Sequence, residues 1–312
     1  MSTVLVPMIR TFDAAEFDPR ELVELKGEQR ISLCLPARNE EATVGAVVET
    51  ARRELVERVP LIDELLVIDD HSTDRTTNVA AAAGAHVIAA ADVLPRFGEG
   101  HGKGEALWKS LFASDGDVIV WCDTDVQDFD SSFVVGLTGP LLTRPQLGFV
   151  KGFYERPLRE GRDGGGRVTE LVARPALALL FPQLASVVQP LAGEYAGRRE
   201  LLELLPFAGG YGVDIGLLID VAERFGLDAI AQVDLGTRFH RNRPLAELAP
   251  QATAVLQAVL RRAAPDATSE IASLMRSGEP AVDIDGAERP PLATVPEYGR
   301  PGLGTGSSGL LA

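Results

Sequence analysis

The 312-residue sequence has few cysteines and no long apolar run, and its basic residues are a minority. The two cysteines, Cys34 and Cys122, each lie in an apolar segment typical of a buried strand, so we expect core residues rather than a disulfide. No segment reaches the ~20 consecutive apolar residues of a membrane-spanning helix, and residues 1–10 lack a signal-peptide pattern. We therefore expect a cytoplasmic protein with no stable membrane association.

Positive charge is scarce, since 30 Lys and Arg face 45 Asp and Glu and the net charge is -15. Nucleic acids and anionic lipid surfaces are bound through basic fields, so this balance argues against both as partners. Any anionic small molecule must instead meet a local group of basic side chains. The 46% hydrophobic content is sufficient for a sizeable core and argues against a chain that is disordered throughout.

Strand-like and helix-like segments alternate along the first half of the chain. The expected strands are residues 31–35, 64–68, 85–89 and 118–122, and the expected helices between them include 73–83 and 104–113. The first helix has apolar side chains at helical spacing, namely Val44, Val47, Val48, Ala51, Leu55 and Val59. This β-α-β-α-β-α-β order predicts a mostly parallel sheet with helices on both faces.

Polar residues follow three of the expected strands, at the sheet edge where open α/β proteins bind their ligands. They are Pro-Ala-Arg-Asn-Glu-Glu at 36–41, Asp-Asp-His-Ser-Thr-Asp at 69–74 and Asp-Thr-Asp at 123–125. Two carboxylates at the end of a buried strand are costly unless a cation neutralises them. A divalent metal would do so and would also stabilise a departing diphosphate. A lone Asp-x-Asp is a weak motif, and taken by itself it favours the alternative of a solvated acidic loop.

The three strand ends together resemble the nucleotide-binding half of GT-A-fold glycosyltransferases, in which the second aspartate of Asp-x-Asp holds the metal. Further motifs resemble the glucosyl-3-phosphoglycerate synthase family in particular. These are Gly-Lys-Gly-Glu-Ala-Leu-Trp at 102–108, Gly-Gly-Gly-Arg-Val-Thr-Glu-Leu at 164–171, Gln-Pro-Leu-Ala-Gly-Glu-Tyr at 189–195, Tyr-Gly-Val-Asp-Ile-Gly at 211–216 and His-Arg-Asn-Arg-Pro-Leu at 240–245. The resemblance extends from about residue 30 to residue 248.

This resemblance implies a Rossmann-like GT-A fold and transfer of glucose from UDP-glucose to 3-phosphoglycerate with retention of configuration. It also implies a homodimer. The chain divides accordingly into an N-terminal arm (1–29), a nucleotide-sugar-binding half (30–148), an acceptor-binding half with C-terminal helices (149–263) and a Pro/Gly-rich tail (264–312). We expect the tail to be disordered.

The same resemblance assigns roles to individual residues. The catalytic residues it implies are Asp125, Lys103 and Asp214, and the metal ligands are Asp125 and His240. Oxygen ligands with one imidazole suit Mg²⁺ and also Mn²⁺. The residues implied to bind the nucleotide sugar are Pro36, Ala37, Arg38, Glu40, Asp70, Lys103, Asp123, Thr124, Asp125 and Asp214.

The acceptor carries a phosphate and a carboxylate, which suit guanidinium groups and backbone amides. Arg167 follows three glycines, and Val168 and Thr169 are expected to begin a helix whose N-terminus favours an anion. A triple glycine is also a common linker, so the family pattern decides in favour of an anion site. The implied acceptor residues are Gly166, Arg167, Val168, Thr169, Asn242 and Arg243.

Arg38, Asp70 and Asp214 depart from the family pattern, in which we expect an apolar residue, a serine and a glutamate. These departures leave open the choice between UDP-glucose and GDP-mannose as the donor. A polyprenyl phosphate acceptor is a further alternative, against which the lack of a basic amphipathic helix or membrane span argues, and a non-catalytic nucleotide-sugar-binding protein is a more distant one. The mechanism is also open, since no residue is evident as a nucleophile and we favour attack from the face that UDP leaves.

The apolar stripe of the helix expected at 244–262 could form a dimer interface or cover the protein's own core.

Overall fold

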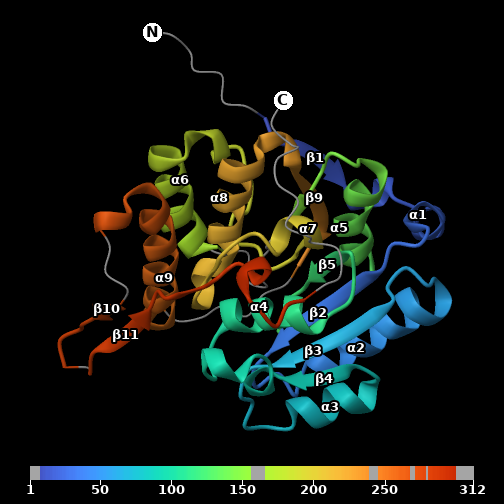
Figure 1. Ribbon diagram of the computed structural model, residues 1–312, viewed down its shortest axis with the longest axis horizontal. Helices are drawn as coiled ribbons and strands as arrows, with labels where there is room; N and C mark the ends of the chain where they lie inside the picture. Colours follow the sequence, from blue (N-terminus) through green and yellow to red (C-terminus); the bar gives the residue numbers. More distant parts are fainter. Residues whose placement is uncertain (1–7, 156–165, 239–244, 268–270, 279, 300–312) are drawn as a thin grey trace.

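The computed structural model describes residues 8–155, 166–238, 245–267, 271–278 and 280–299. One eight-stranded sheet crosses the molecule in the order β1-β9-β6-β7-β5-β2-β3-β4 (Figure 1). Neighbouring strands are parallel except β7, which runs antiparallel to β5 and β6. The strands are β1 (Arg10–Asp13), β2 (Ile31–Ala37), β3 (Glu64–Asp69), β4 (His86–Ala89), β5 (Val118–Trp121), β6 (Phe149–Glu155), β7 (Tyr195–Arg198) and β9 (Ile230–Thr237). The predicted mostly parallel α/β fold is confirmed.

The central strands β2, β3 and β5 are almost wholly buried apolar runs, as expected for strands covered on both faces. Their side chains alternate between two cores. Leu33 and Leu35 pack in the core that contains apolar side chains of α1, α2 and α5, whereas Cys34 packs in the core of α4, α6, α8 and α9. Cys34 and Cys122 are both buried and reduced, as predicted.

The helices cover the two faces of the sheet, and α6, α8 and α9 lie together on one of them (Figure 1). Their bounds are α1 (Pro19–Lys26), α2 (Val44–Arg52), α3 (Thr76–Ala83), α4 (Lys103–Ala113), α5 (Ser132–Thr143), α6 (Arg174–Leu180), α7 (Arg199–Leu202), α8 (Val213–Phe225) and α9 (Leu245–Ala263). The predicted apolar face of α2 and the π-helical turn after it is buried from Val44 to Val59. No helix in the described ranges is long and apolar enough to cross a membrane.

The N-terminal residues expected to form an arm contribute to the sheet. β1 pairs with β9 and forms the sheet edge, and Leu22 of α1 is buried in the core. This edge pairing joins residues more than 200 positions apart in sequence, and nothing in the local pattern of residues 10–13 predicts it.

The expectation of a disordered tail from residue 264 is wrong for the described residues up to 299. β10 (Ile271–Leu274) pairs with β11 (Val282–Asp285), and β12 (Glu288–Arg289) pairs with β8 (Phe207–Ala208). Leu292 and Val295 are buried, and Trp108 Nε1 donates to the Pro290 carbonyl at 2.8 Å. A segment without periodicity is ordered here by long-range contacts. Residues 300–312 lie outside the described residues.

The apolar stripe of α9 has mixed surroundings. Val255 and Val259 are buried in the protein's own core, whereas Leu256 is 41% exposed. The division at residues 148 and 149 stays a prediction, and strands from both sides of it form the eight-stranded sheet.

Candidate active site

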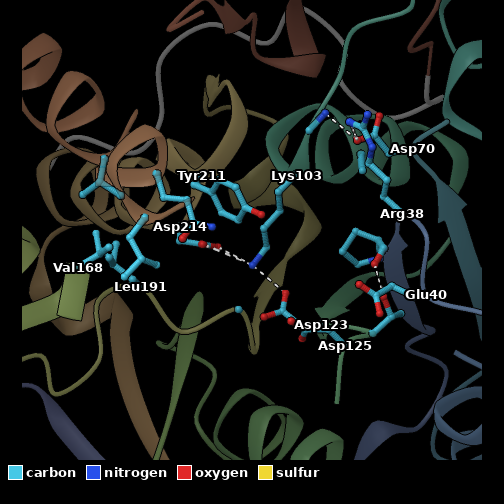
Figure 2. Close-up of a pocket in the computed structure, with 18 of the residues that line it drawn as sticks. Arg38, Glu40, Asp70, Lys103, Asp123, Asp125, Val168, Leu191, Tyr211 and Asp214 are labelled. Atoms are coloured by element: carbon cyan, nitrogen blue, oxygen red, sulfur yellow. Dashed lines mark hydrogen bonds and ion pairs between the residues drawn. The ribbon is translucent and has the colours of Figure 1, made fainter. Parts of the chain in front are cut away.

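A cavity of about 540 Å³ lies at the carboxyl ends of β2 and β5, beside the start of α4 and α8. All ten residues predicted to bind the nucleotide sugar line it, and so do the predicted acceptor residues from Gly166 to Thr169. Figure 2 shows Lys103, Asp123, Asp125 and Asp214 gathered around the cavity. The predicted His240, Asn242 and Arg243 lie outside the described residues.

Lys103, the first residue of α4, is the cation at the centre of this group (Figure 2). Its Nζ lies 2.9 Å from Asp123 Oδ1 and 3.1 Å from Asp214 Oδ1. Burial opposes the charge of the ammonium, but the carboxylates of Asp123 and Asp214 outweigh it and raise the Lys103 pKa. Lys103 is therefore a fixed positive charge in the cavity.

Two glycines make this arrangement possible. Gly102 has φ 89° and ψ 175°, an extended conformation at positive φ that essentially only glycine adopts, and Lys103 follows it at the beginning of α4. At Gly193, a Cβ atom would come within 2.1 Å of Asp123 Oδ2, so any side chain there would displace the carboxylate. The glycines of the two motifs at 102–108 and 189–195 thus serve backbone conformation and close approach.

Arg238 contacts Asp125, and sequence reasoning assigned it no role in the site. It is fully buried at the end of β9, where it forms an ion pair with Glu194. Its guanidinium also lies 3.1 Å from Asp125 Oδ1 and donates to the Tyr154 hydroxyl at 3.0 Å. Burial opposes its charge, but Glu194 above all raises the pKa of Arg238. The signal that could have located it is the excess of carboxylates around Asp125, which requires a second buried cation.

The ends of β2 and β3 are fastened to one another by hydrogen bonds. The Asn39 amide donates to Ser72 Oγ at 2.9 Å, and the Thr73 amide donates to Asn39 Oδ1 at 2.8 Å. Asn39 has φ 56°, so the chain turns sharply here. Thr124 Oγ1 donates to the Pro36 carbonyl at 2.8 Å, which ties the β5 end to the same turn.

Asp70, one of the departures from the family pattern, is anchored beside this turn. Its Oδ2 accepts the Gly102 amide at 2.8 Å and lies 3.5 Å from Arg38 Nη1. The two departures at positions 38 and 70 are therefore paired as opposite charges at one end of the cavity (Figure 2).

The predicted acceptor segment begins a helix, as expected. Gly166 has φ 74°, and helical residues follow from Arg167 through a π-helical turn (Thr169–Ala173) into α6. The Glu170 amide donates to the Gly166 carbonyl at 2.9 Å, and Thr169 is buried. The glycine at 166 therefore takes the left-handed conformation that begins this helix.

The Asp125 carboxylate fits a divalent cation. Its side chain is 43% exposed toward the cavity, and Arg238 holds Oδ1 in place. Carboxylate oxygens are preferred ligands of Mg²⁺ and Mn²⁺.

Lys151 of β6 is a second buried lysine beneath the cavity. Its Nζ donates to the Ala192 carbonyl at 2.7 Å and lies 4.2 Å from the centre of the Tyr195 ring. Burial lowers its pKa to about 8, although the Asp214 carboxylate opposes this shift. Lys151 therefore carries a charge that is costly in the folded protein.

The pKa of Lys151 predicts how stability depends on pH. The folded-state pKa is about 8 and the ordinary value is 10.5, so between these values the unfolded chain holds a proton that the folded protein has lost. The contribution of Lys151 to the free energy of unfolding should therefore rise with pH across this window, by at most ~1.4 kcal/mol per pH unit. Urea unfolding from pH 7.5 to 10.5, compared with Lys151→Met, measures this contribution. Equal pH dependence in both proteins would contradict it.

Residues 32–138 match the glycosyl transferase family 2 model. The chain is 47% identical over 309 residues to glucosyl-3-phosphoglycerate synthase of Petrotoga mobilis, covering 93% of this chain and 95% of the relative. It also resembles crystal structures of the Mycobacterium tuberculosis glucosyl-3-phosphoglycerate synthase. One, in complex with Mn²⁺, UDP-glucose and phosphoglyceric acid, has a TM-score of 0.84 and 46% identity and covers 91% of this chain and 98% of that one. Another, with Mg²⁺ and UDP, has a TM-score of 0.82 and 45% identity and covers 92% and 99%.

The fold and these matches define a glycosyltransferase of the GT-A fold. The high identity over nearly the whole length is more specific. The chain belongs to the glucosyl-3-phosphoglycerate synthase family.

Proposed function

We propose that this enzyme transfers glucose from UDP-glucose to 3-phosphoglycerate, with retention of configuration, to give glucosyl-3-phosphoglycerate. The observation that carries the proposal is the single cavity lined by the predicted donor residues and by the described acceptor residues. A donor and an acceptor bound there would lie next to each other without domain movement. The similar Mycobacterium tuberculosis synthase binds UDP-glucose and phosphoglyceric acid together with Mn²⁺ in its crystal structure.

In this proposal the nucleotide lies along the ends of β2 and β5. Pro36, Ala37 and Glu40 contact the uridine, and Arg38 and Asp70 border it. Asp123 and Thr124 complete the wall beneath the nucleotide. The hydrogen bonds that fasten this turn hold it in shape before the donor binds, which reduces the entropic cost of binding.

The metal is Mg²⁺, or Mn²⁺, held by Asp125 and His240. When bound, it neutralises the negative charge of the diphosphate leaving group. Arg238 orients the Asp125 carboxylate, since its Nη2 lies 3.1 Å from Asp125 Oδ1. Lys103 adds a fixed positive charge near the departing phosphate, and its own position is set by Asp123 and Asp214.

Asp214, at the start of α8, positions the glucose in this proposal. Its carboxylate is buried and paired with Lys103, which suits a hydrogen-bond acceptor rather than a freely moving base. The acceptor hydroxyl attacks on the face that UDP leaves, and its proton passes to the leaving phosphate. A glycosyl adduct trapped on Asp214 or Glu194 would contradict this mechanism.

The direct test is an assay of UDP release with UDP-glucose and Mg²⁺, with and without 3-phosphoglycerate. We expect release that depends on the acceptor and on the metal. Acceptor-independent hydrolysis would contradict the proposed acceptor, and turnover only with GDP-sugars would contradict the proposed donor. The comparison of UDP-glucose with GDP-sugars is informative because Arg38 and Asp70 form an ion pair where the family pattern has an apolar residue and a serine. Both residues border the proposed nucleotide site.

Replacing Arg167 with alanine should weaken acceptor binding. The phosphate and carboxylate of 3-phosphoglycerate are proposed to bind at Gly166, Arg167, Val168 and Thr169, with Asn242 and Arg243. Removal of one charge-assisted contact should raise the KM for 3-phosphoglycerate ~10- to 100-fold and leave the UDP-glucose affinity within ~2-fold. Arg174→Ala, a nearby exposed arginine that does not line the cavity, is the matched control. An unchanged acceptor KM in Arg167→Ala would contradict the assignment.

We also propose that the enzyme is a cytoplasmic homodimer. Leu171 and Leu179, in the segment that leads into and forms α6, are 73% and 81% exposed, and Leu256 of α9 is 41% exposed. Such leucines fit an interface with a second copy of the chain. Sedimentation equilibrium should give a dimer mass, and a Leu171→Asp, Leu179→Asp variant should give a monomer. A monomeric parent protein would contradict the proposal.

A further inference from the structure

A cluster of imidazole and carboxylate groups lies at the end of β3, apart from Asp125. Asp70 and His71 directly follow β3, and His101 belongs to the loop that precedes α4. Each of the three offers one ligand atom, and these atoms lie within 4.8 Å of one another. The cluster therefore joins two loops through groups that bind metals.

The geometry directs these groups toward one point. Asp70 Oδ1 lies 3.0 Å from His71 Nδ1 and 3.8 Å from His101 Nδ1. The other oxygen, Oδ2, is occupied by the Gly102 amide at 2.8 Å, so this hydrogen bond orients the carboxylate with Oδ1 toward both imidazoles. The two rings are side by side, with centroids 4.2 Å apart.

A fourth group lies close to the cluster. Glu99 Oε2 is 3.8 Å from His71 Nε2. That nitrogen is buried and has no hydrogen-bond partner among the described residues. His71 therefore faces one carboxylate with each ring nitrogen, and one of these contacts is longer than a hydrogen bond.

The surrounding charge favours a cation overall. Asp70 and Glu99 contribute two carboxylates, and Arg38 lies 3.5 Å from Asp70 Oδ2 on the side away from the imidazoles. The site is accessible, because the His101 side chain is 60% exposed and that of His71 is 24% exposed. A hydrated ion can therefore reach it.

We propose that Asp70, His71 and His101 form a second divalent metal site, selective for Zn²⁺ and similar borderline cations, with water as the fourth ligand and Glu99 as the outer-shell carboxylate that faces the other nitrogen of His71. Two imidazole nitrogens and one carboxylate oxygen are a ligand set that suits zinc better than magnesium. Zinc takes ligands at ~2.0–2.2 Å, which requires ligand atoms ~3.3 Å apart in a tetrahedron, so only small side-chain movements are needed.

Binding would join the end of β3 to the loop that leads through Gly102 into α4, which begins at Lys103. Asp70 also lines the large cavity, so the second metal site would lie next to the proposed site of Mg²⁺ or Mn²⁺. The two sites would not share Asp125. The proposal concerns metal binding alone and does not depend on the identity of the donor or the acceptor.

The test uses tag-free, full-length protein and Co²⁺, whose visible absorption bands report imidazole-containing tetrahedral sites. The protein has four histidines, so few other sites compete. We expect Zn²⁺-displaceable Co²⁺ bands that persist in Asp125→Asn. In the double variant His71→Ala, His101→Ala, the affinity for Co²⁺ should fall by more than ~100-fold. Even the loss of an outer-shell partner of a metal ligand costs ~10- to 100-fold in metal affinity. His86→Ala, which removes an exposed histidine at the start of β4, is the matched control.

The single variant His101→Ala guards against misfolding of the double variant, because the His101 side chain is mostly exposed. Thermal unfolding without metal verifies that both variants are folded. Bands that vanish in Asp125→Asn but remain in the histidine variants would overturn the proposal. So would the absence of Co²⁺ bands and of zinc binding by equilibrium dialysis in the parent protein.

Discussion

The Asp125→Asn enzyme is expected to lose at least ~10³-fold in kcat, measured as UDP release with saturating UDP-glucose and 3-phosphoglycerate. The physical reason is the metal, since charge stabilisation by a bound divalent cation contributes several kcal/mol and each 1.36 kcal/mol is tenfold in rate. Asparagine preserves the volume and can still accept from Arg238, whose Nη2 now lies 3.1 Å from Asp125 Oδ1. The change therefore removes a charge from the site and little else.

Two further measurements separate loss of the metal from loss of the fold. Mn²⁺ affinity, followed by electron paramagnetic resonance, should fall together with kcat, and the midpoint of thermal unfolding without metal should stay within a few degrees of the parent. Asp128→Asn, an exposed aspartate in the same loop, should leave turnover unchanged. Near-normal kcat in Asp125→Asn would remove Asp125 from the metal site and with it the proposed role of Asp-x-Asp.

The first half of the fold could be predicted because its signals are local. Each strand from 31 to 121 is a short apolar run, the helix after β2 has a regular apolar face, and every predicted element is present within a few residues. The three polar strand ends were expected to meet, and they line one cavity. That expectation needed only one rule, namely that parallel strands end at the same edge of a sheet.

The parts that could not be predicted depend on pairing between distant segments. β7 enters the sheet antiparallel between β5 and β6, and β1 pairs with β9, which follows it by more than 200 residues. Arg238 reaches Asp125 only because β9 lies beside β6 in this order. Similarly, β12 is two residues long and is ordered by its pairing with β8. Such a pairing leaves no local pattern in the sequence, and the composition of this segment is that of a disordered tail. The roles assigned to individual site residues stay predictions until variants are measured.

Lys103→Met is expected to lower both stability and turnover, for two different reasons. In the parent protein Lys103 neutralises Asp123 and Asp214, with Nζ to oxygen distances of 2.9 and 3.1 Å. Removal of one partner from a buried ion pair leaves an uncompensated charge and typically costs ~3–5 kcal/mol. Loss of a fixed positive charge near the leaving group should also lower kcat by ~10²- to 10³-fold. Denaturant unfolding and UDP release measure the two effects independently.

The double variant Lys103→Met, Asp214→Asn distinguishes the structural role of Lys103 from the catalytic one. With one carboxylate neutralised, part of the lost stability should return, because fewer buried negative charges remain without a cation. Asparagine at position 214 keeps an oxygen that can accept a hydrogen bond from the glucose, but turnover should not return, since no cation is restored beside the departing phosphate. Lys103→Arg keeps the charge and should retain more activity than Lys103→Met, although its planar group does not reproduce the ammonium geometry. If the double variant regained turnover together with stability, Lys103 would serve to hold the cavity in shape, and Asp125 and its metal would be left to stabilise the leaving group.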